Sequence, residues 1–100
     1  MVAAMATVTG PAEALAAITE LSADSVGPWT REYRGYRGTL VFVDGDARTS
    51  RVITLWETAA DERAARTARG AMRDQLMATA GLEVVSFDVY DVPGHEYVAG

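Results

Sequence analysis

The stretch that decides the fold is GYRGTLVFVDGDARTSRVITLWET, from Gly35 to Thr58. Two runs rich in β-branched and aromatic residues flank Asp44-Gly45-Asp46, which is a strong turn signal. The pattern predicts a β-hairpin with one strand over Gly38–Asp44 and the other over Arg51–Glu57. Both strands carry apolar residues at successive positions, so both faces of the hairpin require cover.

The hairpin leads directly into a predicted helix over Thr58–Thr79. Thr58 and Asp61 stand at the spacing of a capping box, with Asp where Glu is commoner, and Gly81 suits the residue after the helix. We expect Arg66, Arg69 and Arg73 to lie along one edge of the apolar face. That face is expected to comprise Ala64, Ala65, Ala68, Ala71, Met72 and Leu76.

The segments before the hairpin and after the second helix are predicted to add two strands and one helix. Alternating small and apolar residues predict a strand over Val2–Val8, and a helix is expected over Pro11–Ala23. A last strand is expected over Leu82–Val92, before Pro93-Gly94. The order β-α-β-β-α-β predicts an α+β, ferredoxin-like domain over residues 1–100, a four-stranded antiparallel sheet with both helices on one face.

The other face of this sheet has no cover within so short a chain. A second copy of the same sheet is the simplest partner, because an apolar sheet face packs well against its own kind. The sequence therefore predicts a homodimer.

Composition excludes several classes of function. The net charge of −5 argues against nucleic acid as a partner, since phosphate-binding surfaces need excess basic charge. With no Cys and a single His, His95 in the C-terminal tail, no metal site or other cofactor is expected. No apolar run approaches the roughly 18 residues of a membrane span, and no signal-peptide pattern opens the chain. We expect a cytoplasmic protein without membrane contact.

The chain resembles the antibiotic biosynthesis monooxygenase-like family of the dimeric α+β barrel superfamily. The residues that carry the resemblance are Gly35–Gly38, Leu40–Asp44 and Leu55–Thr58, and the element order extends it over nearly the whole chain. The resemblance implies two sheets packed face to face and a pocket between each sheet and its helices. Some members oxidise polycyclic phenols or anthrones with molecular oxygen and neither metal nor flavin, and a related branch binds and degrades haem.

In both branches a Trp at the end of the third strand can line the pocket, and Trp56 matches that position. Both activities are often associated with an Asn near the first strand, and the haem branch with a His in the second helix. This sequence contains no Asn, and residues 58–79 contain no His.

Trp56 is the first candidate for a binding residue. If Val41 pairs with Ile53, Gly38 falls opposite Trp56, on the face that also carries Leu40 and Phe42. A large indole beside a glycine either lines a pocket or fills the core, and the sequence leaves both interpretations open. The indole N–H needs a hydrogen-bond partner, and a ligand is one candidate.

The remaining candidates for ligand contact are Phe42, Tyr36, Met72 and Arg69. Met72 lines a cavity if the small alanines of the helix leave one, and otherwise belongs to the core. Arg69 either reaches an anionic ligand oxygen or lies on a solvated face with local pairs such as Glu62 with Arg66. Tyr36 lies in a segment that closes one end of the sheet or pocket, where a phenol group can exchange protons.

The hypothesis that follows is an antibiotic biosynthesis monooxygenase-like protein, which oxidises or binds an aromatic, polyketide-like small molecule without a cofactor. A non-enzymatic ligand-binding or structural dimer is the alternative from a different class. Haem binding is a third, and it requires His95 or a water on the iron.

Overall fold

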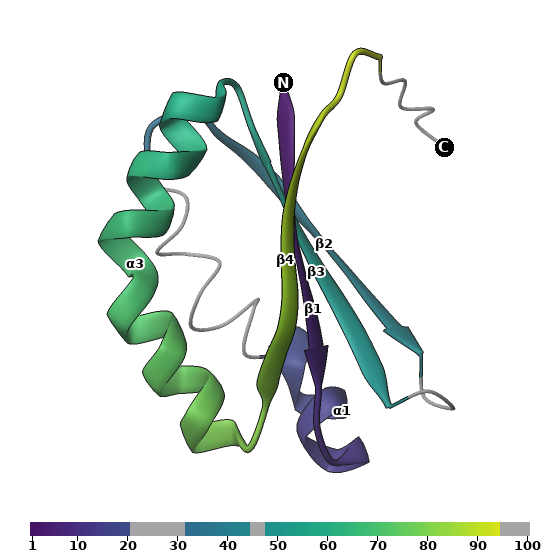
Figure 1. The fold of residues 1–100 in the computed structure, drawn as a ribbon. Coiled ribbons are helices and arrows are strands. Elements are labelled where there is room, and N and C mark those ends of the chain that lie inside the picture. The colour runs from purple at the N-terminus through teal and green to yellow at the C-terminus, as the bar shows by residue number, and fades with distance from the viewer. Residues whose placement is uncertain (21–31, 45–47, 95–100) are drawn as a thin grey trace.

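Six helices and strands follow one another in the computed structural model, which describes residues 1–20, 32–44 and 48–94 (Figure 1). They are β1 (Val2–Thr9), α1 (Ala12–Glu20), β2 (Tyr36–Asp44), β3 (Thr49–Trp56), α3 (Ala59–Ala80) and β4 (Glu83–Asp91). The predicted order is confirmed. Part of the first predicted helix, residues 21–23, lies outside the described residues.

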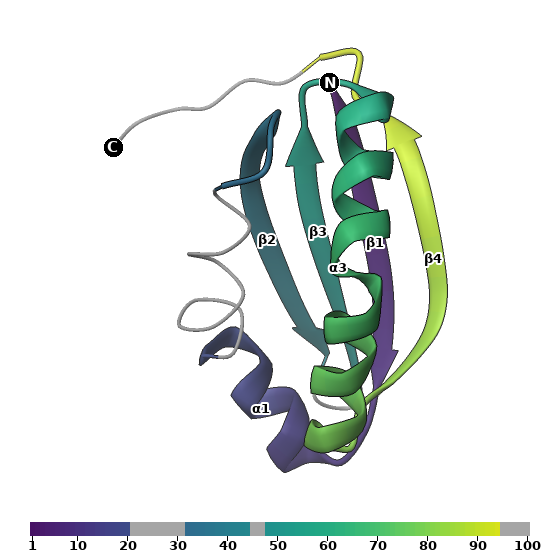
Figure 2. The same ribbon diagram turned by 90° about the vertical axis from the view of Figure 1, so that its left-hand side faces the viewer.

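The four strands form one antiparallel sheet in the order β2-β3-β1-β4. Figure 2 shows this order across the sheet, with α1 and α3 both in front of it. In Figure 1 the sheet is seen closer to its edge, and α3 runs alongside it as a separate layer. This is the ferredoxin-like α+β fold that the sequence predicts. Neither described helix is long and apolar enough to cross a membrane.

The predicted register of the hairpin is wrong by one residue. Val41 pairs with Val52 rather than Ile53, and Gly38 lies opposite Leu55 rather than Trp56. Because successive side chains alternate between faces, this shift of one residue places Trp56 and Phe42 on opposite faces of the sheet. An irregularity between Tyr36 and Gly38 then returns Tyr36 to a position directly across from Trp56.

The helix-covered face holds two clusters of buried side chains. One surrounds Trp56, which is 0% exposed, with Val2, Ala4 and Ala65. The other joins Leu15 of α1 to Val8 and Leu82. The first cluster lies under the N-terminal half of α3. The second lies between the sheet, α1 and the C-terminal end of α3, whose Met77 and Ala80 pack against it.

The opposite face of the sheet is uncovered by any described residue. Leu40 and Phe42 on β2 are 49% and 53% exposed, and Tyr90 on β4 is 51% exposed. The register places Ile53 and Met5 in the same row as Leu40. An apolar face of this kind is typical of a surface that packs against another protein.

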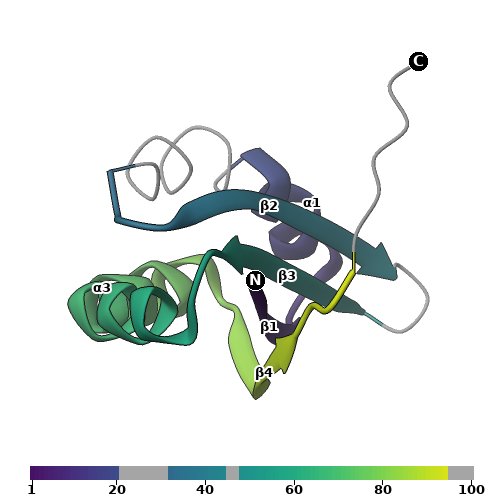
Figure 3. The same ribbon diagram turned by 90° about the horizontal axis from the view of Figure 1, so that it is seen from above.

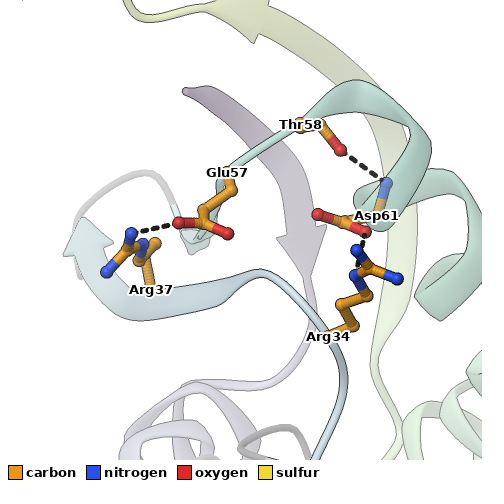
Figure 4. A network of polar contacts seen from close by, with 5 residues as sticks. All are labelled: Arg34, Arg37, Glu57, Thr58 and Asp61. Carbon is orange, nitrogen blue, oxygen red and sulfur yellow. Dashed lines mark hydrogen bonds and ion pairs between the residues drawn. The ribbon is translucent and has the colours of Figure 1, made fainter.

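The start of α3 is held by the segment that enters β2. Thr58 caps the helix by accepting a hydrogen bond from the Asp61 backbone N–H at 3.0 Å. The ion pairs Arg34–Asp61 and Arg37–Glu57 bind the segment to both sides of this cap (Figure 4). The Glu57 N–H also donates to the carbonyl of Gly35 at 2.8 Å.

Gly35 permits this close approach. Its φ is 81°, a left-handed conformation that side chains rarely adopt, and a Cβ at this position would lie 2.7 Å from the Cβ of Asp61. The glycine of the GYRG stretch is therefore required by the contact between the β2 entry and the α3 cap.

We expect Gly35→Ala to lower the free energy of unfolding by about 1–3 kcal/mol, through left-handed strain and the clash with Asp61. Gly70→Ala is the matched control, because Gly70 is helical and has no atom within 4 Å of an added Cβ. It should raise stability by about 0.5–1 kcal/mol. Urea denaturation at one protein concentration measures both changes, and equal effects of the two substitutions would contradict the assigned contact.

Candidate functional site

The inner face of α3 is not the alanine face predicted from the sequence. Ala64, Ala68, Ala71 and Met72 are exposed, and only Ala65 and Leu76 of the predicted set turn inward. Beyond Asp61 at the helix cap, the buried and half-buried positions form one stripe of helical period: Glu62, Ala65, Arg66, Arg69, Gly70, Arg73, Leu76, Met77 and Ala80. The N-terminal half of this stripe is charged and the C-terminal half is apolar.

Long arginine side chains suit the distance between helix and sheet. Seen from above, the α3 ribbon stands apart from the strands (Figure 3). An arginine can bury its aliphatic stem while its guanidinium reaches the next layer. The Cζ atoms of Arg66 and Arg73 lie 4.8 Å and 6.0 Å from the ring centroid of Phe87 on β4, so two cations share one ring.

A second group of cation–ring contacts surrounds Arg69 and Trp56. The Arg69 Cζ lies 5.6 Å from the Trp56 ring and 5.9 Å from the Tyr33 ring. Tyr36 meets Trp56 edge to face, with centroids 5.5 Å apart and planes at 66°. We call the set of Arg66, Arg69, Arg73, Tyr33, Tyr36, Trp56 and Phe87 the arginine–aromatic layer.

The environment of Arg69 opposes its charge. Burial, followed by repulsion from Arg73, lowers the pKa of Arg69 from its ordinary value. An arginine starts from so high a pKa that it stays charged at neutral pH. The layer therefore holds a desolvated cation, which favours an anion or an electron-rich ring as neighbour.

Glu62 is the carboxylate of the stripe. It is 3% exposed, and its Oε1 lies 3.3 Å from an Nη of Arg66, one helical turn away. The predicted local pair of Glu62 with Arg66 is thus present, although it lies inside the molecule rather than on a solvated face. A buried carboxylate is costly without such a partner.

The structure brings together three of the five predicted ligand residues. Trp56, Tyr36 and Arg69 meet in the arginine–aromatic layer. Phe42 points to the open face of the sheet, and Met72 is 40% exposed on α3. The indole N–H of Trp56 donates to the hydroxyl of Thr54 at 2.9 Å, so it has a partner within its own strand.

Four residues of the layer were not among the predicted ligand residues. Arg66 and Arg73 were expected on a solvated edge, and Tyr33 and Phe87 were not candidates for ligand contact. The signal for the arginines was their spacing. The arginines follow Glu62 at the spacing of one helical face. The same face continues into Leu76 and Met77. Nothing in the sequence of β4 distinguishes Phe87 from its apolar neighbours.

The residues that the structure describes hold no group of three or more His, Asp or Glu side chains placed to bind a metal ion. The chemistry of the layer is that of guanidinium groups, phenols and π surfaces. Such groups bind and orient anionic or electron-rich aromatic molecules.

Solved structures of other proteins share this arrangement of helices and strands. A monooxygenase from the ActVA-Orf6 gene of Streptomyces coelicolor, in complex with nanaomycin D, matches with a TM-score of 0.76 at 16% identity over 98% of this chain and 92% of that one. SnoaB, a cofactor-independent oxygenase from Streptomyces nogalater, matches with a TM-score of 0.67 at 13% identity over 94% of each chain. An antibiotic biosynthesis monooxygenase matches with a TM-score of 0.66 at 18% identity, over 94% of this chain and all of the other.

This chain shares its ferredoxin-like α+β fold with these monooxygenases. No protein-family model matches the sequence, and no curated protein resembles it closely enough to match. The similarity to the monooxygenases is therefore one of three-dimensional structure, and a shared fold does not by itself imply a shared function.

The Glu62–Arg66 pair gives a direct test of this layer. We expect Arg66→Met to lower the free energy of unfolding by about 1–3 kcal/mol at neutral pH, because it leaves a buried carboxylate without its counter-ion. Glu62→Gln in the same chain should recover part of that loss, giving a coupling energy above about 1 kcal/mol in a double-mutant cycle.

Arg63→Met is the control for this cycle, because Arg63 is exposed on the same helix. It should change stability by less than about 0.5 kcal/mol. Additive effects of the Glu62 and Arg66 substitutions would show that the pair is not buried as described.

Proposed function

We propose that this protein is an antibiotic biosynthesis monooxygenase-like homodimer whose arginine–aromatic layer binds an aromatic, polyketide-like small molecule and promotes its oxidation by molecular oxygen. The observation that carries the proposal is the position of the Arg69 guanidinium over the rings of Trp56 and Tyr33, with Tyr36 packed edge to face on Trp56. The oxygenases that share the fold support it.

The layer supplies the two things that such a reaction requires. Aromatic side chains stack on a polycyclic ring and orient it. A desolvated guanidinium stabilises the negative charge that forms when a phenol or anthrone loses a proton. The resulting anion is electron-rich and reduces oxygen directly. For an anthrone the balance is one anthrone and one O2 to one anthraquinone and one water, with the ring carbon oxidised and oxygen reduced.

Tyr33 and Tyr36 are groups of the layer that can exchange a proton, and the Glu62 carboxylate is already paired with Arg66. Tyr36 bonds through its hydroxyl to the Thr39 hydroxyl at 2.5 Å, while its ring contacts Trp56. A phenol in this position can pass a proton between a bound ring and solvent. Tyr36 is therefore the residue that we assign to proton transfer.

A non-enzymatic binding or structural dimer is the second candidate, and one observation favours it. Trp56 is fully buried and its N–H is already bonded to Thr54, as expected of a core residue. The same fold and the same dimer would then serve binding or assembly without turnover.

Oxygen uptake with anthrone separates the two candidates. The monooxygenase proposal predicts saturable uptake that Arg69→Met reduces at least about tenfold, because one charge-assisted contact to the anion is lost. Arg63→Met is the matched control and should leave uptake unchanged. Saturable quenching of Trp56 fluorescence by anthraquinone in a Trp29→Phe background, without oxygen uptake, would support binding alone.

The proposed dimer joins the open faces of two sheets. Phe42→Glu should raise the dimer dissociation constant at least about a hundredfold, because it places a charge within the apolar interface. Val43→Glu is the control, since Val43 is 50% exposed on the helix-covered face beside it. Analytical ultracentrifugation measures both, and a monomeric wild-type protein at micromolar concentration would contradict the dimer.

A further inference from the structure

The charged half of the α3 stripe itself carries more guanidinium groups than carboxylates. It holds the three guanidinium groups of Arg66, Arg69 and Arg73 and the single carboxylate of Glu62, which is 3.3 Å from Arg66. The one described acid beside Arg73 is Asp74, whose Oδ1 lies 3.6 Å from an Nη. Asp74 is 73% exposed, so water competes for its charge and the contact is weak.

Arg73 also has an unused donor. Its Nε is buried and has no hydrogen-bond partner among the residues that the structure describes. Buried donors in folded proteins are nearly always bonded, so one without a partner calls for an explanation. In a guanidinium, Nε–H and the neighbouring Nη–H project from one edge and together match the two oxygens of a carboxylate.

The surroundings of Arg73 suit the ring of a ligand as well as its charge. Arg66 and Arg73 both approach the ring of Phe87, at 4.8 Å and 6.0 Å. Val89 and Val84 lie on the same face of β4 and are 41% and 37% exposed. A cationic pair therefore sits above an aromatic ring with uncovered apolar residues on either side of it.

We propose that Arg66 and Arg73 form an oxyanion subsite over Phe87, and that the aromatic ligand of this protein carries a carboxylate which this subsite binds. The inference rests on the proposed function, because it assumes that the arginine–aromatic layer takes an aromatic molecule. It adds that the molecule is an acid, held by an ionised group that is separate from the ring position stabilised by Arg69.

The test compares anthraquinone-2-carboxylate with its methyl ester, which has the same ring system and no charge. Calorimetric titration at fixed ionic strength gives the dissociation constant of each compound. We expect the acid to bind at least about tenfold more tightly than the ester, as a bidentate charged contact implies. Arg73→Met should reduce this ratio to near one.

Arg63→Met is the matched control, because it removes the same charge from an exposed position of α3 and should leave the ratio unchanged. Equal binding of acid and ester by the wild-type protein would overturn the subsite while leaving the proposed aromatic site in place. A ratio that survives Arg73→Met would also overturn it, since the carboxylate would then be recognised elsewhere.

If neither quinone binds, the carboxylate subsite is tested by measuring the thermal midpoint of unfolding with and without 2-naphthoate. A rise in the thermal midpoint that Arg73→Met abolishes would support the subsite and contradict the polycyclic ligand of the proposed function. The absence of such a rise would overturn both.

Discussion

Burial of charge between α3 and the sheet is the constraint on which the rest of this structure depends. A helix whose inner stripe begins with Glu62, Arg66, Arg69 and Arg73 cannot pack closely on an apolar sheet without large desolvation costs. The sheet places aromatic rings beneath these arginines: Phe87 lies under two guanidinium groups and Trp56 under a third. Rings of this kind are among the few apolar surfaces that attract a cation.

This constraint explains why the core is small at the N-terminal half of α3. The first buried cluster contains Trp56 and three small or medium side chains, while Tyr33, Tyr36 and Phe87 pack at its edge. Tighter apolar packing would give more stability, since each buried apolar side chain contributes about 1.5–3 kcal/mol. Retaining arginines where leucines would be more stable is typical of sites selected for binding rather than for stability.

Much of the fold could be predicted from the sequence, because it depends on local signals. The Asp44-Gly45-Asp46 sequence predicts a turn, of which residues 45 and 46 lie outside the described residues. The Thr58 cap and Gly81 mark the ends of α3, and the element order then implies the sheet topology. The register of the hairpin could not be predicted. Both strands are apolar on both faces, so the alternation of residues does not select one register, and the irregularity that brings Tyr36 opposite Trp56 is a tertiary feature.

The candidate site could be predicted only in part. Trp56, Tyr36 and Arg69 were recognised by residue type, and the structure brings them together. Phe42 was assigned to the same face because a one-residue error in register reverses every side chain of a strand. The helix face was misjudged because alanines form an apolar stripe on α3 as regular as the charged one, and periodicity alone does not say which faces inward.

The most direct test of the central claim is an NMR spectrum of the arginine Nε–H groups at neutral pH. Arg73 should give a slowly exchanging Nε–H signal, because this atom is buried, and the signal should shift when 2-naphthoate is added. Exposed Arg63 should give a signal lost to rapid exchange with water. An Arg73 signal that exchanges as rapidly as that of Arg63 and ignores the anion would contradict a buried, ligand-binding charged stripe.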